Sequence, residues 1–216
     1  MVPHGGSAPL RLPEAAPRPS GPPSRSRSPG SSAPRNLSPD QAWSRAEGGS
    51  RPSPVGLDEL QTAIAAATSR NDLGRELVRF TASRFRRTAA FAVRQDQILG
   101  WVGQGPGIDP KRLGQIAISI GSPSIFTPVT GSTSVYIGPL PAGPESRTYY
   151  TLFGSPIPPG ILLVPITVRD RLAAILYADN QADPLGPIEL PVWKRVAHLA
   201  AMSLEIMILR NRILRS

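Results

Sequence analysis

Apolar positions follow a helical period at the start of the folded part of this chain and a strand period further along. Leu57, Leu60 and Ile64 recur at three- and four-residue spacing, which predicts an amphipathic helix. A second helix is expected to follow, with Asn71 or Asp72 as its cap. The sequence therefore opens its folded part with two helices.

After residue 88 the apolar residues alternate or run together in short stretches bounded by turn residues, which is typical of strands. The predicted strands are 89–93, 98–102, 116–120, 135–137, 161–168 and 172–179. Short helices are expected at 123–129 and 145–153, a long helix at 190–214, and a loop at 103–110 that Pro110 ends without starting a helix. Antiparallel hairpins with helices at both ends predict an α+β fold, a central antiparallel sheet flanked by helices with a long C-terminal helix.

Residues 1–56 differ in composition from the rest of the chain. They contain 12 Pro, 7 Gly and 11 Ser but only five Leu, Ile, Val or Phe residues. Such a segment buries too little apolar surface to offset the entropy of ordering it. We therefore expect a disordered Pro/Ser/Arg-rich tail at 1–56, which is either a solvated linker or a docking segment, and one domain at 57–216.

The net charge of +9 is spread over both parts of the chain, and no dense basic arm occurs. Basicity favours anionic partners in general, but a diffuse excess does not predict a nucleic-acid partner. Arg75, Arg79 and Arg86 form a stripe on the second predicted helix and just after it. The stripe is read as a solvated face, with a phosphate or partner patch as the alternative.

Residue types that carry catalysis and metal binding are sparse. The chain has no cysteine, which excludes disulfides, thiolate catalysis and thiolate metal sites. His4 falls in the tail, and His198 falls on a polar edge of the final helix, where a solvated side chain is the expected role. Asp179 and Asp183 have no partner at a chemically useful spacing, and Asp179 with Asn180 is expected to shape a turn. We expect no catalytic residue, no metal and no cofactor.

No apolar run is long enough for a signal peptide or a membrane span. The sequence therefore predicts a cytoplasmic protein without a membrane partner.

The predicted hairpin at 161–179 resembles that of a known family. Its Leu-Leu-Val-Pro-Ile stretch at 162–166, its turn at 169–171 and its second strand up to Asp179 are similar to the "L-x-x-P-I … G-x-x-x-G-x-L-Y" hairpin of GAF domains. The upstream strand 90–93 and the long final helix also match that family's order of elements. The chain departs from the pattern at Asp170 and Ala174, where glycine is common.

The resemblance implies a fold with a cavity on one face of the sheet, roofed by the middle helices and loops. It also implies signalling roles, in which members bind small molecules or pack against partners, usually as dimers. The residue sets of the cyclic-nucleotide-binding members are absent. The Cys or His of the bilin-binding members and the catalytic cysteines of the methionine-sulfoxide-reducing members are absent as well.

Two functions remain open from the sequence, with an enzyme of another type as a third and weaker reading. The first is a non-catalytic sensory or regulatory domain that binds a small ligand over the sheet. Its pocket is expected to be lined by Phe91, Trp101, Ile118, Phe126, Tyr149, Tyr150 and Tyr177, unless these side chains are core. The second is a ligand-free module that dimerises or docks another signalling protein.

A homodimer through the final helix is expected from its apolar pattern. One broad face, with Trp193 and Val196, suits packing on the sheet. A further seam has the spacing of a coiled coil, and its residues are Val192, Leu199, Met202, Ile206, Leu209 and Ile213. The alternative is that the first two helices of the same chain cover this seam.

Overall fold

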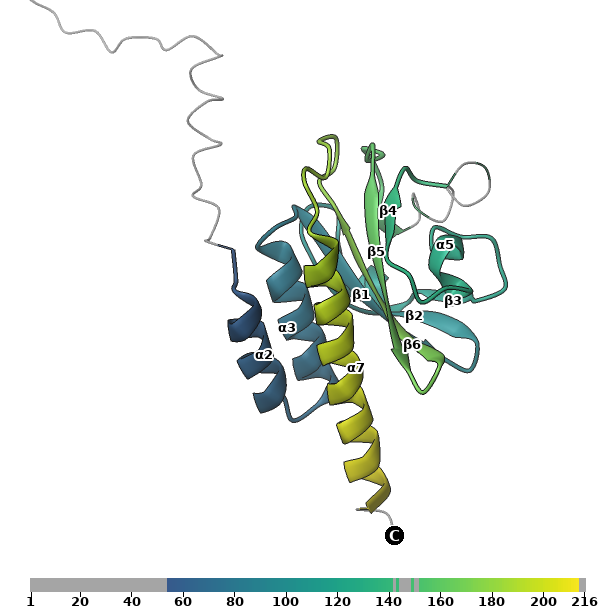
Figure 1. Cartoon of the computed structure of the whole chain (residues 1–216). Coiled ribbons are helices and arrows are strands. Elements are labelled where there is room, and N and C mark those ends of the chain that lie inside the picture. The colour runs from purple at the N-terminus through teal and green to yellow at the C-terminus, as the bar shows by residue number, and fades with distance from the viewer. Residues whose placement is uncertain (1–53, 142, 144–148, 150–151, 214–216) are drawn as a thin grey trace, which may run out of the picture. The chain divides into compact units, whose positions relative to one another are not determined.

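The computed structural model describes residues 54–141, 143, 149 and 152–213 of the 216-residue chain (Figure 1). The helices are α2 (Leu57–Ala66), α3 (Arg70–Ala82), α4 (Pro110–Gly114), α5 (Thr127–Thr130) and α7 (Leu190–Ile213). The strands are β1 (Arg87–Arg94), β2 (Gln97–Gln104), β3 (Ala117–Ser119), β4 (Tyr136–Gly138), β5 (Ile161–Val168) and β6 (Arg171–Asp179). This is the α+β class that the sequence predicts.

The strands form one six-stranded sheet in the order β3-β2-β1-β6-β5-β4. Every neighbouring pair is antiparallel. The hairpins β1–β2 and β5–β6 lie side by side at the centre, joined through β1 and β6. Helices α2, α3 and α7 gather on one side of the sheet, and α5 lies on the other (Figure 1). Both predicted hairpins and the long final helix are confirmed.

Both faces of the central strands β1, β5 and β6 are covered, and successive side chains of a strand point to opposite faces of the sheet. In β5, Leu162 and Val164 point to α2, α3 and α7, whereas Ile161 and Leu163 point to the opposite side. We call the first cluster the helical-face core and the second the roof-face core. Since β5 supplies alternate residues to two cores, its apolar character is nearly continuous.

Helix α3 begins earlier than the sequence suggested. Its N-cap is Ser69, whose hydroxyl accepts a hydrogen bond from the Asp72 amide at 3.2 Å. The Asp72 carboxylate accepts in return from the Ser69 amide at 3.0 Å, which completes a capping box. The prediction of Asn71 or Asp72 as the cap was therefore wrong, because Asp72 acts from the third helical position.

Helix α4 was not predicted, and Pro110 does start a helix. Asp109 is the N-cap, and its carboxylate accepts a hydrogen bond from the Lys111 amide at 2.8 Å. Proline suits the first helical position, where an amide donor has no partner within the helix. The predicted helix 123–129 is confirmed only at its end, as α5. Most of the predicted helix 145–153 lies outside the described residues.

Two-residue turns with positive φ close both central hairpins. Gln95 and Asp96 have φ of 48° and 58°, and Arg169 and Asp170 have φ of 51° and 62°. Positive φ at both central residues matches the twist of the flanking strands and favours Gly, Asn or Asp. The second turn is thus the place where the GAF pattern has glycine and this chain has Asp170.

The contacts of the folded unit begin before Leu57, the predicted start of the domain. The Val55 amide donates to the Ser83 hydroxyl at 3.0 Å, and the Val55 carbonyl accepts from the Arg84 guanidinium at 2.8 Å. These two bonds attach the chain ahead of α2 to the end of α3. In the part of the chain that the structure describes, no helix is both long and apolar enough to cross a bilayer.

Candidate functional site

The roof-face core brings together four of the seven predicted pocket residues. Phe91, Phe126, Tyr149 and Tyr177 all have exposed fractions of 0%. Phe91 lies 4.7 Å from Phe126, and Phe153 stacks on Tyr177 at 4.4 Å, both measured between ring centroids. The rings therefore contact one another and fill the space over this face of the sheet.

The other three predicted pocket residues lie elsewhere. Ile118 on β3 is half-buried against the edge of the roof-face core, and Tyr150 lies outside the described residues. Trp101 packs on the helical-face core, on the opposite side of the sheet. The turn at Gln95 and Asp96 sets the register of β1 on β2, in which Phe91 lies opposite Gly100. Residues opposite each other share one face of the sheet, so Trp101, the next residue after Gly100, points to the other face. The position of this two-residue turn in the sequence was the signal that Phe91 and Trp101 lie on opposite faces of the sheet.

A buried ion pair lies at the polar end of the roof-face core. Arg87 begins β1 and Asp179 ends β6, directly opposite each other in the sheet, and both side chains have exposed fractions of 0%. The Arg87 guanidinium donates from Nε to Asp179 Oδ2 at 2.8 Å and from Nη2 to Oδ1 at 3.0 Å. A bidentate pair of this kind is strong and fixes the geometry of both partners.

Neighbouring groups form further hydrogen bonds with the Arg87 guanidinium and the Asp179 carboxylate. Arg87 Nη1 donates to the Phe153 carbonyl at 3.2 Å and Nη2 to the Tyr149 hydroxyl. The Tyr177 hydroxyl donates to Asp179 Oδ2, and the Tyr149 hydroxyl donates to the Pro156 carbonyl at 2.9 Å. Both tyrosines thus turn their polar ends to the ion pair and their rings to the core. Buried charges persist in proteins when they are paired and hydrogen-bonded in this way.

The sequence pattern did not predict this pair, since Asp179 was expected to have no charged partner. The predicted role in the turn is present as well, because Asp179 Oδ1 accepts from the Gln181 amide at 2.6 Å. Asp183, also expected to be unpaired, forms an exposed ion pair with Arg86 at 3.0 Å. Only the pairing of β1 with β6 makes Arg87 and Asp179 neighbours, and they are 92 residues apart in sequence.

Both buried tyrosines are expected to make the protein sensitive to alkali. Burial, and then the charge of Asp179, raise the pKa of Tyr149 from 10.0 to about 12 and that of Tyr177 well above 10.0. The folded state therefore keeps protons that the unfolded state loses. The free energy of unfolding should be unaffected below about pH 10 and fall by up to ~1.4 kcal/mol per pH unit for each group above it.

Urea unfolding between about pH 9 and pH 11.5 measures this effect. Tyr177→Phe should make the alkaline fall shallower, because one of the two groups is removed. Tyr136→Phe is the matched control, since its hydroxyl bonds the Pro139 carbonyl in an exposed position. An unchanged slope in Tyr177→Phe would contradict the assignment.

The predicted dimer seam on α7 divides into two parts. Leu199 has an exposed fraction of only 9% and belongs to the helical-face core, and Val192 packs against that core. Their place in an exposed seam was wrong, because α2 and α3 also pack on α7. The remaining four residues are exposed, and they are Met202 at 50%, Ile206 at 47%, Leu209 at 40% and Ile213 at 74%.

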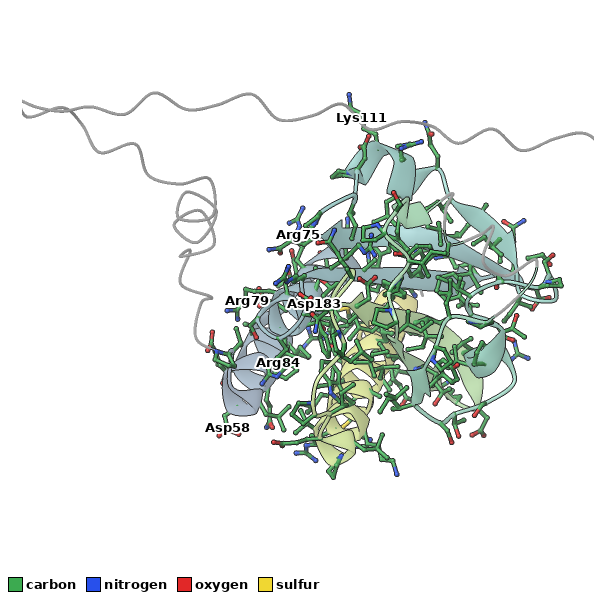
Figure 2. All side chains as sticks on the ribbon, turned by 90° about the horizontal axis from the view of Figure 1, so that it is seen from above. Asp58, Arg75, Arg79, Arg84, Lys111 and Asp183 are labelled. Atoms are coloured by element: carbon green, nitrogen blue, oxygen red, sulfur yellow. The ribbon has the colours of Figure 1, made fainter. Side chains whose placement is uncertain are left out.

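The three arginines of the predicted stripe on and after α3 all have acidic partners. The arginine stripe forms the ion pairs Arg75–Asp72 at 3.9 Å, Arg79–Glu59 and Arg79–Glu76 at 2.8 Å, and Arg86–Asp183 at 3.0 Å. Lys111 on α4 and Asp58 on α2 project from well separated parts of the surface (Figure 2). His198 is exposed on α7. Within the described ranges, no three His, Asp or Glu side chains gather as a metal site would require.

No protein-family model matches the chain, and no curated protein does. Solved structures do match. One is the GAF domain of a phosphoenolpyruvate-protein phosphotransferase from Coxiella burnetii, with a TM-score of 0.57 and 16% identity over 72% of this chain and 93% of that chain. Another is a methyl-accepting chemotaxis protein, with a TM-score of 0.57 and 13% identity over 69% of this chain and 97% of that chain.

A third match is the free methionine-R-sulfoxide reductase of Neisseria meningitidis, solved in complex with its substrate. Its TM-score is 0.53, with 15% identity over 71% of this chain and 89% of that chain. At these identities the likeness concerns the fold, and function depends on the residues of a site. The matches confirm what the hairpin at 161–179 predicts: this chain has the fold of GAF domains.

Proposed function

We propose that this chain is a non-catalytic regulatory module of signal transduction that pairs with a second copy through the C-terminal half of α7. The observation that carries the proposal is the exposed apolar row of Met202, Ile206, Leu209 and Ile213. Their spacing of four, three and four residues is that of a coiled-coil seam. Figure 1 shows these last turns of α7 running beyond α2 and α3.

A second copy is the occupant that suits this row best. An apolar stripe of this length on a helix usually marks an interface, and a two-fold pair covers the same stripe on both chains at once. The row continues directly from Leu199, which is buried under the domain. A paired α7 would therefore be rigidly attached to the sheet that it packs on.

The packing of the roof face supports a module that needs no ligand there. Phe91, Phe126 and Tyr177 are fully buried against one another and against Phe153. A small molecule among these rings would have to displace contacts that are already made. These side chains are therefore better explained as core than as the lining of a pocket. This favours a dimerisation module over a sensor that binds a small molecule on this face.

The composition of the chain supports the absence of catalysis. The chain has no cysteine, so the thiol chemistry that the resemblance implies for sulfoxide-reducing members has no nucleophile here. Among the described side chains, the buried pair of Arg87 and Asp179 is saturated by hydrogen bonds from and to its neighbours. The structural matches to a methyl-accepting chemotaxis protein and to the GAF domain of a phosphoenolpyruvate-protein phosphotransferase are in keeping with a regulatory role.

Light scattering tests the pairing. Wild-type protein should run at twice the 23.0 kDa chain mass at about 50 µM. Ile206→Glu with Leu209→Glu should give a folded monomer, because both residues are exposed and four like charges would then face one another. Leu199 is left intact, because its replacement would disturb the core.

The matched control is His198→Glu with Asn211→Glu, which adds two carboxylates at exposed positions of the same helix outside the row. It should remain dimeric. A wild-type protein that runs as a monomer, or a double variant of the row that stays dimeric, would overturn the proposal.

A further inference from the structure

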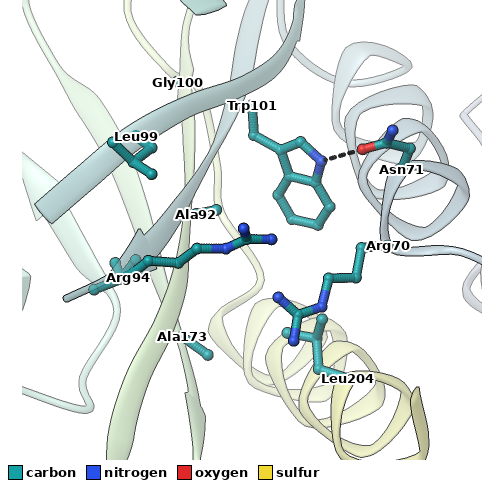
Figure 3. Close-up of a pocket in the computed structure, with 10 residues that line it drawn as sticks. Arg70, Asn71, Ala92, Arg94, Leu99, Gly100, Trp101, Ala173 and Leu204 are labelled. Carbon is teal, nitrogen blue, oxygen red and sulfur yellow. Dashed lines mark hydrogen bonds between the residues drawn. The ribbon is translucent and has the colours of Figure 1, made fainter. Parts of the chain in front are cut away.

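A cavity of about 220 Å³ lies on the helical face of the sheet, away from the roof-face core. It is bounded by the first turn of α3, by β1 and β2, and by Ala173 of β6 and Leu204 of α7 (Figure 3). It adjoins a wider cleft of about 1180 Å³, which shares Arg70, Arg94 and Leu204 with it. A small group held in the cavity could therefore belong to a larger molecule that extends into the cleft.

Two arginines direct their guanidinium groups into this space. Arg70 reaches it from the first turn of α3 and Arg94 from the end of β1 (Figure 3). Neither forms an ion pair with any residue that the structure describes, whereas Arg75, Arg79, Arg86 and Arg169 all have acidic partners. Burial, and then the charge of Arg94, lower the pKa of Arg70. Two unpaired cations close together are stabilised by an anion between them.

Trp101 forms a fixed wall beside the two arginines. Its indole Nε1 donates to the Asn71 side-chain oxygen at 3.1 Å. Gly74 of α3 leaves room for the ring, because a Cβ there would lie only 2.8 Å from the indole Cε2 atom. Ala92 and Ala173 also border the cavity, and their short side chains leave it open. The result is an aromatic surface next to two charged donors.

We propose that this cavity binds the phosphate group of a small phosphorylated molecule, with the organic part of the ligand against Trp101. A phosphate monoester carries a charge of roughly −1.5 to −2 at neutral pH, which matches two guanidinium groups better than a single carboxylate does. Arginine donates to phosphate in a bidentate geometry, and an aromatic wall suits a flat apolar group. Arg171 lines the wider cleft and adds positive charge, and Asp96 also lines it.

This site is independent of the pairing through α7, so either proposal can fail alone. The probe is phenyl phosphate, which combines a phosphate group with a flat ring. It is titrated to millimolar concentration while the indole N–H resonances are followed by NMR. We expect a saturable shift of the Trp101 resonance, assigned with Trp101→Phe. Inorganic phosphate should bind more weakly, and benzyl alcohol should cause no saturable shift.

Variants decide whether the two arginines are responsible. Arg70→Gln and Arg94→Gln should each weaken the binding of phenyl phosphate by at least about tenfold, with thermal melts close to that of the wild type. Arg75→Gln is the matched control, since Arg75 lies on α3 and already faces Asp72, and its affinity should be unchanged. The absence of a saturable shift, or equal weakening by Arg75→Gln, would overturn the phosphate site. Equal affinity for inorganic phosphate would overturn the role of Trp101.

Discussion

Asp179→Ala is expected to lower the free energy of unfolding by about 3–5 kcal/mol, because it leaves the Arg87 cation buried without its partner. Both side chains have exposed fractions of 0%. Burial alone would lower the pKa of Arg87, but the hydrogen bond and charge of Asp179, together with Tyr177 and Tyr149, outweigh burial and raise it. The substitution also removes the acceptor for the Tyr177 hydroxyl and for the Gln181 amide.

The neighbouring ion pair provides a control for this prediction. Arg86 and Asp183 form an exposed pair at 3.0 Å, with exposed fractions of 46% and 56%. Asp183→Ala should cost only about 0–1 kcal/mol, because exposed pairs are screened by solvent. Chemical denaturation of both variants measures the contrast, and equal losses would contradict the role given to burial.

A double variant separates the loss of a charge partner from the loss of the pair. Arg87→Met with Asp179→Leu removes both charges and keeps most of the apolar volume. It should recover much of the stability lost in Asp179→Ala, since replacing a whole buried pair by apolar residues is often neutral. A double variant as unstable as Asp179→Ala would show that the hydrogen bonds to Tyr149, Phe153 and Tyr177, rather than the unpaired cation, account for the loss.

The sequence predicts the sheet well because its strands carry local signals. Each central hairpin has a polar two-residue turn between apolar stretches, and β5 and β6 are nearly continuously apolar because both faces of the sheet are covered. The long final helix is also predicted locally, because its apolar residues recur at helical spacing over a long stretch. These elements are specified by residues that are close together in the chain.

Features that depend on tertiary pairing were not predicted. Arg87 and Asp179 meet only because β1 pairs with β6, and an isolated sequence pattern does not reveal which hairpins adjoin. Leu199 has coiled-coil spacing, but it lies where α7 is still covered by the domain. The cavity beside Trp101 likewise combines Arg70 and Arg94 from separate elements, neither of which carries a motif.

Gly100→Ala is expected to destabilise the fold by about 3 kcal/mol or more, because α4 packs against the backbone of β2 at this residue. A Cβ at Gly100 would lie 1.8 Å from the Leu113 carbonyl oxygen and 2.7 Å from its carbonyl carbon. The Gly100 amide also donates to the Ile116 carbonyl at 3.1 Å. The clash is with backbone, so no change of rotamer relieves it.

Gly114→Ala is the matched control for this substitution. Gly114 follows Leu113 in α4, and a Cβ there would meet no atom within 4 Å. Alanine also has a higher helix propensity than glycine, so this variant should be neutral or more stable by up to about 1 kcal/mol. Both variants add one methyl group, on β2 in Gly100→Ala and on α4 in Gly114→Ala. Thermal or urea unfolding compares their stabilities. A Gly100→Ala protein as stable as Gly114→Ala would contradict the close approach of α4 to β2, whereas a large loss confined to Gly100→Ala is expected from the 1.8 Å contact.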